Sequence, residues 1–316
     1  IASVVLLEQG KVLELRERRN PGDMLCGWGG AGAFSDGKLT LSPEVGGSLG
    51  ELRERGRLLQ LLGQADELWV AHGAPTEVFG GISAKFEDLG DRARLADLEL
   101  LPMRIRHIGT DNCRQVLSRL RHSLEGRIEV RCGCRVEKLL VEAGQVRGVR
   151  LAEGGELSSR FVVLGPGRSG ASWMKSQAAA LGLKTNASAV DIGVRVELPA
   201  PVLREITDTT YEAKLIHYSK TFDDKVRTFC MNPCGEVVIE KNAGILTVNG
   251  HSYTGRKTEN TNFAILVSSA FTEPFDDPIA YGLYIARLAN LLGKGVIIQR
   301  LGDLLVGRRS NPKRIA

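Results

Sequence analysis

The fold of this chain is decided by one glycine-rich stretch, Gly27-Trp28-Gly29-Gly30-Ala31-Gly32-Ala33-Phe34-Ser35-Asp36-Gly37-Lys38. Five glycines fall within eleven residues of it, so the backbone can take conformations that side chains forbid. A loop of this kind presents bare N–H groups to an anion. Ser35 adds a hydroxyl, Lys38 adds a positive charge suited to a pyrophosphate, and Asp36-Gly37 is a turn signal. The alternative is a purely structural Ω-loop.

A short apolar run rich in valine, Ser3–Glu8, precedes this loop and predicts a buried strand. In doubly wound nucleotide-binding folds, the acid that ends the second strand accepts hydrogen bonds from the adenosine ribose. Glu8 stands at such a strand end. The phosphate-binding glycines would lie about 20 residues upstream, before residue 1. Strand-end acids are common, so Glu8 is also explained by structure alone.

A third element, Val162–Gly170, runs from a predicted buried strand into closely spaced glycines and then a helix. Gly165 and Gly167 would let the backbone approach a flat ligand. The following helix would point its N-terminus at negative charge.

The remaining pattern gives a coarse secondary structure. We predict helices over residues 49–70, 80–98, 112–124, 171–181 and 278–292. We predict strands in the first half over 104–108, 128–131, 136–141, 146–151 and 161–164, the last four as a meander. Gly56 and Gly63 would weaken or split the first helix, and Asp111 would cap the third. The last helix, amphipathic in pattern, would close the sheet of the second half.

After Asn186 the sequence pattern predicts strands without intervening helices. We predict them over 190–198, 213–218, 226–231, 236–241, 244–248 and 263–269. The fold class is therefore α/β, with a Rossmann-like nucleotide-binding domain over 1–188 and a mostly antiparallel, sheet-rich α+β domain over 189–316. A helical insertion would occupy about 43–104.

Composition describes an ordinary globular protein, with 43% hydrophobic and 25% charged residues. No run is long and apolar enough for a membrane span, and no signal peptide is recognisable. Six cysteines without a secretory signal favour free thiols and a cytoplasmic location, with a redox pair at Cys230 and Cys234 as an alternative. Their spacing predicts no metal site. The net charge of +5 suits an anionic ligand.

The glycine-rich stretch, continued by Leu39-Thr40, resembles the signature of a family of bacterial and archaeal FAD-dependent dehydrogenases or oxidoreductases. These are distant relatives of flavoproteins with a glutathione-reductase-like FAD domain. Three further stretches match it: Val163–Gly170, Ile192–Glu197 and Asn262–Val267. The resemblance covers nearly the whole chain.

The resemblance implies an FAD/NAD(P)-binding fold, with FAD as the cofactor and NAD(P)H as a candidate electron donor. Glu8 would hold the ribose, and the strand from Val136 would pair its backbone with the adenine. Gly165 and Gly167, with Arg168 beside them, would pass under the dinucleotide. The loop would wrap the pyrophosphate and flavin through Gly29, Gly30, Ala31, Gly32, Ser35, Asp36, Gly37 and Lys38.

The chain departs from the family pattern at its ends. The family begins with a strand and Gly-x-Gly-x-x-Gly and closes with a Gly-Asp segment at the flavin. Gly302-Asp303 has the dipeptide without glycine-rich surroundings. We therefore expect this chain to be truncated at both ends.

The expected function is an FAD-dependent oxidoreductase that moves a hydride through bound flavin to or from a small-molecule substrate. Acid or base groups would come from the second domain, where His217, His251, Tyr253 and Arg195 have suitable chemistry; no one of them is assigned as catalytic. One alternative is a flavin-dependent enzyme that modifies tRNA or another nucleic acid, which the absence of a focused basic stripe disfavours. The other is a non-catalytic truncated binding module. The sequence gives neither the substrate nor the oligomeric state.

Overall fold

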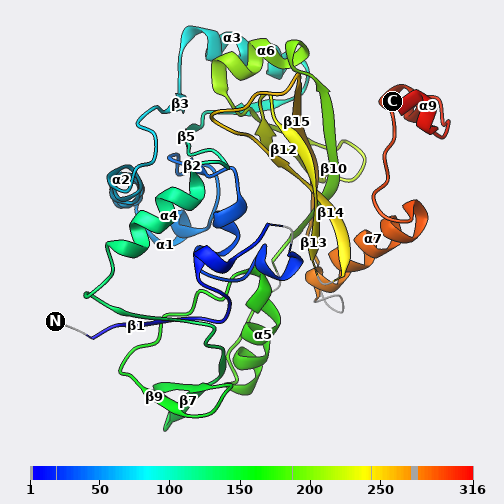
Figure 1. Ribbon diagram of the computed structural model, residues 1–316. Helices are drawn as coiled ribbons and strands as arrows, with labels where there is room; N and C mark the ends of the chain where they lie inside the picture. Colours follow the sequence, from blue (N-terminus) through cyan, green and yellow to red (C-terminus); the bar gives the residue numbers. More distant parts are fainter. Residues whose placement is uncertain (1–2, 19, 187, 243, 272–276, 316) are drawn as a thin grey trace.

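The computed structural model describes residues 3–18, 20–186, 188–242, 244–271 and 277–315 of a mixed α/β protein (Figure 1). Its helices and strands confirm a mixed α/β protein, and the Rossmann-like character of the first half remains a prediction. The described part of the first half holds one parallel strand pair, β1–β6, beside two antiparallel sheets. The division into two domains near residue 188 remains a prediction.

The first half carries three small sheets. The parallel pair joins β1 (Val5–Glu8) to β6 (Glu129–Cys132). An antiparallel sheet has the order β2 (Lys38–Thr40), β5 (Arg104–His107) and β3 (Phe79–Gly80). The other antiparallel sheet has the order β7 (Val136–Glu142), β8 (Gln145–Leu151) and β9 (Glu156–Ser158). In the parallel pair Glu8 stands opposite Cys132, so both strands end at the same edge.

The helices of the first half are α1 (Leu49–Leu52), α2 (Arg55–Ala71), α3 (Ala84–Leu95), α4 (Cys113–His122) and α5 (Ala171–Ala180). The predicted helix over 49–70 is broken, but at Arg53–Glu54 instead of at a glycine. Both Gly56 and Gly63 lie inside α2, where each costs about 1 kcal/mol. Tertiary contacts offset that cost: Asp66 of α2 accepts two hydrogen bonds, of 2.6 and 2.7 Å, from the buried guanidinium of Arg106 in β5.

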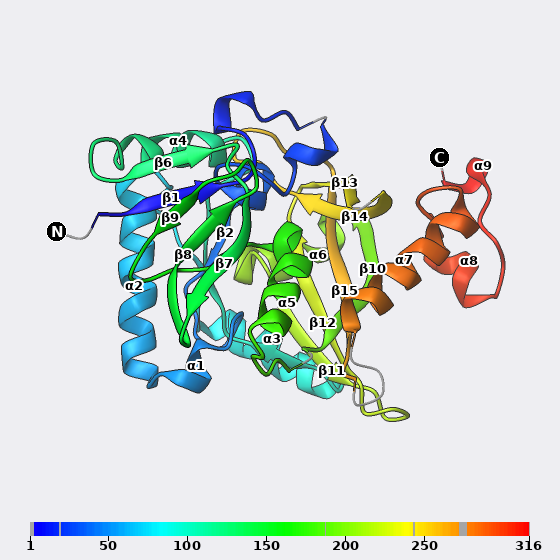
Figure 2. The same cartoon turned by 90° about the horizontal axis from the view of Figure 1, so that it is seen from below.

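A five-stranded antiparallel sheet dominates the second half (Figures 1 and 2). Its order is β10 (Val190–Pro199), β15 (Asn260–Ser269), β12 (Lys225–Asn232), β11 (Lys214–Tyr218) and β4 (Glu99–Leu101). A separate hairpin pairs β13 (Glu236–Asn242) with β14 (Ile245–His251). The antiparallel prediction is confirmed. One edge strand, β4, comes from the segment predicted as a helical insertion.

The second half also contains the helices α6 (Ala200–Thr210), α7 (Pro278–Gly293), α8 (Leu301–Leu305) and α9 (Pro312–Ile315). Of these, α6 and α7 contact the strands. The prediction of strands without intervening helices was wrong at α6, which fills the segment between the predicted strands 190–198 and 213–218. Its β-branched residues lower its helix propensity, so the sequence carries only a weak helical signal there. Contact with α3 stabilises α6, where Arg92 binds Glu205 at 2.6 Å. The predicted α7 contacts β14 and β10, but Leu288, Leu291 and Leu292 remain exposed.

The predicted meander was wrong in two places. Its first strand, β6, pairs in parallel with β1 instead of continuing the antiparallel sheet. The segment 161–164 is not a strand, and Phe161 and Val163 are 74% and 96% exposed. No described strand forms backbone pairs with this segment, and β9 is the third strand of the sheet instead.

The predicted cap of α4 was also wrong. Asn112 occupies the cap position, without a side-chain hydrogen bond there. Asp111 turns to the second half and accepts hydrogen bonds from the backbone N–H groups of Thr254 (3.1 Å) and Gly255 (3.0 Å).

Ile105 of β5 lies at the centre of one hydrophobic cluster, with Met103, Tyr211, Val45 and Phe79 around it. The cluster joins residues of the first half to Tyr211, so it packs the two halves together.

We expect Ile105→Ala to lower the free energy of unfolding by about 2–5 kcal/mol, because the side chain is 1% exposed and its removal leaves a cavity. Urea unfolding measures the change. The matched control, Leu95→Ala at a side chain that is 90% exposed, should change stability by no more than about 0.5 kcal/mol. Equal losses in both variants would contradict the assigned core.

Candidate functional site

The candidate site lies at the common carboxyl edge of β1 and β6, where Glu8 ties the glycine-rich loop to the strand end. Glu8 Oε1 accepts hydrogen bonds from the backbone N–H groups of Gly10 (2.8 Å) and Gly27 (3.0 Å). The two backbones pass so closely that a Cβ on Gly10 would lie 2.5 Å from Gly27 N. Gly27 itself has φ of +118°, which side chains rarely adopt. Glycine is therefore required at both positions.

Arg16 holds the loop from inside. Its side chain is 2% exposed, and its guanidinium donates to the carbonyls of Asp23 (2.5 Å), Trp28 (2.5 Å) and Gly30 (2.8 Å). It also lies 5.0 Å from the centre of the Phe34 ring. One cation thus joins backbone carbonyls from the segment before the loop and from two points within it.

Sequence reasoning missed Arg16. It stands in the run of charged residues Lys11–Arg19, where a buried charge is not expected. The only indication in the sequence was indirect. A glycine-rich loop leaves many backbone carbonyls unpaired, and these carbonyls need a nearby hydrogen-bond donor.

Asp23 fixes the segment before the loop. Its carboxylate accepts from the Glu17 backbone N–H at 2.9 Å and from Lys11 Nζ at 3.0 Å. These contacts, the backbone hydrogen bond first, lower the pKa of Asp23. It remains ionised, and its carbonyl is one that Arg16 binds.

The turn at Gly165–Gly170 reaches the same edge. Gln9 Nε2 donates to Ser169 Oγ at 3.4 Å, and Val136 and Val162 pack in one cluster with Leu7. Gly165, Gly167 and Arg168 are exposed there. The structure therefore brings Glu8, the start of the loop, Val136 and this turn together.

The end of the loop, Ser35–Lys38, contacts the second half of the chain instead of this edge. Asp36 is 5% exposed and accepts hydrogen bonds from Asn232 Nδ2 at 2.7 Å and Lys38 Nζ at 3.0 Å. Lys38 Nζ also lies 3.0 Å from Glu212 Oε2 and donates to the Met231 carbonyl. Ser35 Oγ accepts from the Gly37 backbone N–H. Asp36 and Lys38 thus bind the second half of the chain.

This ion cluster is charged in the folded protein. Burial opposes ionisation of Asp36, but the nearby Lys38 ammonium outweighs it, so the pKa of Asp36 is lowered. Burial alone would lower the pKa of Lys38 as well, yet the Asp36 and Glu212 carboxylates raise it. A buried charge is tolerated here because each member has a partner.

His107, Tyr211 and Ser252 extend the cluster. Ser252 Oγ is 2.9 Å from His107 Nε2 and 3.4 Å from both Asp36 Oδ2 and the Tyr211 hydroxyl. Ser252 is fully buried. Sequence reasoning did not select His107 or Tyr211, which lie at the end of β5 and just after α6. Ser252 belongs to a polar stretch after β14 that the sequence does point to.

The four candidate acid or base residues of the second half differ in their surroundings. His251 is 1% exposed. The Tyr253 hydroxyl donates to Glu236 at 2.6 Å, and Arg195 Nη1 donates to Asn232 Oδ1 at 3.1 Å. His217 lies apart from them, with its Nδ1 2.9 Å from the Asp97 carbonyl. Cys230 and Cys234, the alternative redox pair, are free thiols.

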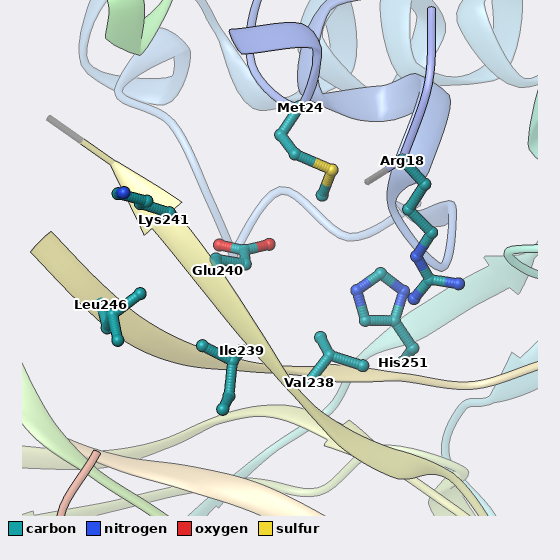
Figure 3. A pocket seen from close by; sticks show the side chains of 8 residues that line it. All are labelled: Arg18, Met24, Val238, Ile239, Glu240, Lys241, Leu246 and His251. Carbon is teal, nitrogen blue, oxygen red and sulfur yellow. The ribbon is translucent and has the colours of Figure 1, made fainter. Parts of the chain in front are cut away.

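A pocket of 320 Å³ lies between the β13–β14 hairpin and the segment before the loop (Figure 3). Arg18 and Met24 line it from that segment, and Val238, Glu240 and His251 line it from the hairpin. Figure 3 shows the imidazole of His251 beside the Arg18 guanidinium.

Residues 189–312 match the family model described as FAD-dependent protein, C-terminal domain-like. The match covers less than half of the chain, and it connects the second half to FAD-dependent proteins. A curated relative from Clostridium beijerinckii, described as an uncharacterized protein, is 27% identical over 305 residues, which is 90% of this chain. The chain spans 50% of that relative's length.

Solved structures give weaker likenesses. L-amino acid deaminase from Proteus vulgaris is 11% identical, with 90% of this chain and 60% of that chain covered and a TM-score of 0.38. Glycine oxidase from Bacillus cereus is 12% identical, with coverages of 91% and 72% and a TM-score of 0.36. TM-scores this low support no argument about fold or chemistry. Within the described residues, no helix has the length and apolar character to cross a membrane.

Replacing Arg16 with lysine should lower the free energy of unfolding by about 2–4 kcal/mol, because an ammonium cannot bind all of these carbonyls and leaves some unpaired. Urea unfolding measures this, and proteolysis within 23–34 should accelerate. The control, Arg147→Lys at an exposed site, should leave both unchanged. Wild-type stability of the Arg16 variant would contradict this role.

Stability should fall as the solution is acidified. Burial lowers the pKa of His107 from 6.5 to about 4, so protonation favours the unfolded chain. The contribution of His107 is fully present above pH 6.5 and is lost as the pH falls toward 4. The loss should reach about 3 kcal/mol. Burial lowers the pKa of His251 as well, which adds in the same direction.

Urea unfolding between about pH 8 and pH 4.5 measures this loss, and comparison with a variant at His107 separates it from the carboxylates that begin to titrate near about pH 4.5. His107→Gln keeps a hydrogen-bonding group near Ser252 and cannot take up the proton, so its stability should fall less. Identical pH dependence in variant and wild type would exclude His107 as a source.

Proposed function

We propose that this protein is an FAD-dependent oxidoreductase of the dehydrogenase type, in which bound flavin carries a hydride to or from a small organic substrate. The observation that carries the proposal is the match of residues 189–312 to FAD-dependent proteins. The glycine-rich loop at the carboxyl edge of β1 and β6 supports it, because dinucleotides bind at the carboxyl ends of parallel strands.

The residues at this edge fit the dinucleotide. Glu8 uses Oε1 for the loop, while no described group hydrogen-bonds with its Oε2, which can accept from a ribose hydroxyl. A Cβ built on Gly32 meets nothing within 4 Å, so that part of the loop faces open space. Gly165 and Gly167 have the same property. Backbone can therefore approach a ligand from two sides.

Val136 fits the proposed adenine contact. It begins β7, which is an edge strand of its sheet and pairs only with β8 among the described strands. Helix α5 uses part of the other edge, where Trp173 Nε1 donates to the Glu137 carbonyl at 2.7 Å and Gln177 Oε1 accepts from the Leu139 N–H at 2.9 Å. The backbone groups that α5 leaves free near Val136 can pair with a base. Arg168, exposed beside Gly167, adds positive charge near the phosphates.

Asp36 and Lys38 were expected to contact the cofactor directly, but in this proposal they position the loop. Because their charged groups bind Glu212, Asn232 and the Met231 carbonyl, they position the loop from beneath. The backbone over Gly29–Gly32, with Ser35 and Gly37 after it, is left to contact the pyrophosphate and flavin. When bound, the flavin supplies the two-electron chemistry, and this chain supplies position and electrostatics.

NAD(P)H is the proposed electron donor. The six free cysteines fit a reducing, cytoplasmic compartment. We also propose that residues 1–188 form a domain that binds the cofactor and that residues 189–316 form a domain that binds the substrate.

FAD added to the purified chain should bind, with the absorption bands of oxidised flavin retained after gel filtration and bleached by NADH or NADPH. Gly32→Ala should weaken binding roughly tenfold or more, because its methyl group occupies the space that a ligand needs. Gly56→Ala is the matched control: that glycine also has open space around it, and it lies in α2 away from the loop.

A chain that takes up no FAD would overturn the proposal for residues 1–316. Equal FAD affinity in the Gly32 and Gly56 variants would overturn the placement of the cofactor against the loop.

A further inference from the structure

The pocket between the β13–β14 hairpin and residues 18–24 contains a buried polar atom without a partner. His251 Nε2 has no hydrogen-bond partner among the described residues, although the side chain is 1% exposed. The ring lines the pocket (Figure 3). Leaving a buried polar atom unpaired costs about 1–3 kcal/mol, so the position calls for a ligand atom.

The hydrogen bonds around the ring define what that ligand atom must be. The Thr110 hydroxyl donates its one hydrogen to the Ser252 carbonyl at 3.1 Å. Thr110 Oγ1 can then only accept from His251 Nδ1, which is 3.2 Å away. The tautomer that fits this arrangement carries its proton on Nδ1 and a lone pair on Nε2. Burial, together with the nearby Arg18, lowers the pKa of His251, which favours this neutral form.

Arg18 gives the same end of the pocket a positive charge. Its Nη1 donates to the Tyr253 hydroxyl at 3.1 Å, and that hydroxyl donates to Glu236. These contacts orient the guanidinium and leave its other N–H groups for a ligand. A guanidinium matches a carboxylate in geometry and charge.

The remaining walls limit the size and polarity of the ligand. Four of the lining residues are apolar: Met24, Val238, Ile239 and Leu246. Glu240 and Lys241 are charged, and the Glu240 carboxylate accepts a hydrogen bond from Asn249 at 2.9 Å. A volume of 320 Å³ is at the small end of ligand pockets. The site suits a small molecule with a short apolar body.

We propose that this pocket binds a small carboxylic acid that carries a hydroxyl or amino group next to its carboxylate. The carboxylate lies against Arg18, and the neighbouring O–H or N–H donates to His251 Nε2. Adjacent groups on the ligand can reach both contacts, because the imidazole lies beside the guanidinium and turns its Nε2 toward the Met24 and Glu240 side of the pocket (Figure 3). An anion without a donor would place lone pairs against the lone pair of Nε2. Binding of the acid is independent of the proposed function. The further statement that this acid is the substrate rests on the proposed function.

Isothermal titration of the full chain with 2-hydroxybutanoate and with butanoate tests the proposal. The hydroxy acid should bind about 3- to 10-fold more tightly, because it alone can donate to Nε2. The 15N resonance of His251 Nε2 should shift with the hydroxy acid only. Inorganic phosphate, a probe of simple anion binding, should bind more weakly than either acid.

Variants separate the two contacts. His251→Asn keeps a side-chain N–H near Thr110 and removes Nε2, so it should abolish the preference for the hydroxy acid. Arg18→Gln should weaken binding of both acids about tenfold or more. Lys220→Gln removes an exposed cation bound to Asp97 and should change neither. Circular dichroism confirms that each variant is folded.

Equal affinity for the two acids in the wild-type chain would overturn the proposal, and so would unchanged affinity in Arg18→Gln. Titration in the presence of FAD adds a further test: displacement of the acid by FAD would assign the pocket to the cofactor instead. Acid binding that persists in a chain unable to hold FAD would contradict the proposed function and leave this site standing.

Discussion

The arrangement of the whole molecule depends on one buried ammonium group. Lys38 Nζ lies 3.0 Å from both Asp36 Oδ2 and Glu212 Oε2 and also binds the Met231 carbonyl. Removing any partner would leave a charge in a place that water does not reach, which is costly. The cluster therefore fixes the end of the glycine-rich loop against the sheet of the second half. Arg16 fixes the beginning of the same loop, so its course is set from both ends.

This double attachment leaves the middle of the loop, Gly29–Gly32, for a ligand. The side chains that carry charge are used inside the protein, and the backbone faces outward at Gly32. Recognition by backbone N–H groups needs little from side chains beyond rigidity. The pocket at His251 begins on the other side of the same segment, at Met24 and Arg18. A cofactor along the loop and a small acid in the pocket would thus be held by adjacent parts of one chain segment.

The sequence predicted the helices and strands with strong periodicity, including β10–β15 and α4, because burial of one face leaves a regular pattern. It failed where tertiary contacts outweigh local preference: α6 is helical despite its β-branched residues, and Asp111 binds the second half instead of capping α4. At the candidate site, the many closely spaced glycines were enough to identify the loop from the sequence. The inward direction of Lys38 and the burial of Arg16 were not predictable, since both depend on partners distant in sequence. The bare nitrogen of His251 depends on a hydroxyl orientation that only the three-dimensional contacts reveal.

The contact between Lys38 and Met231 spans 193 residues, and this has a consequence for how the protein folds. During synthesis the glycine-rich loop emerges long before β12 exists. Contacts of such separation cannot form until the intervening chain is ordered, and folding rates fall as mean contact separation grows. The loop should therefore be among the last parts to reach its final shape. A newly made chain would gain its ligand-binding backbone only at the end of folding, when the second sheet has docked.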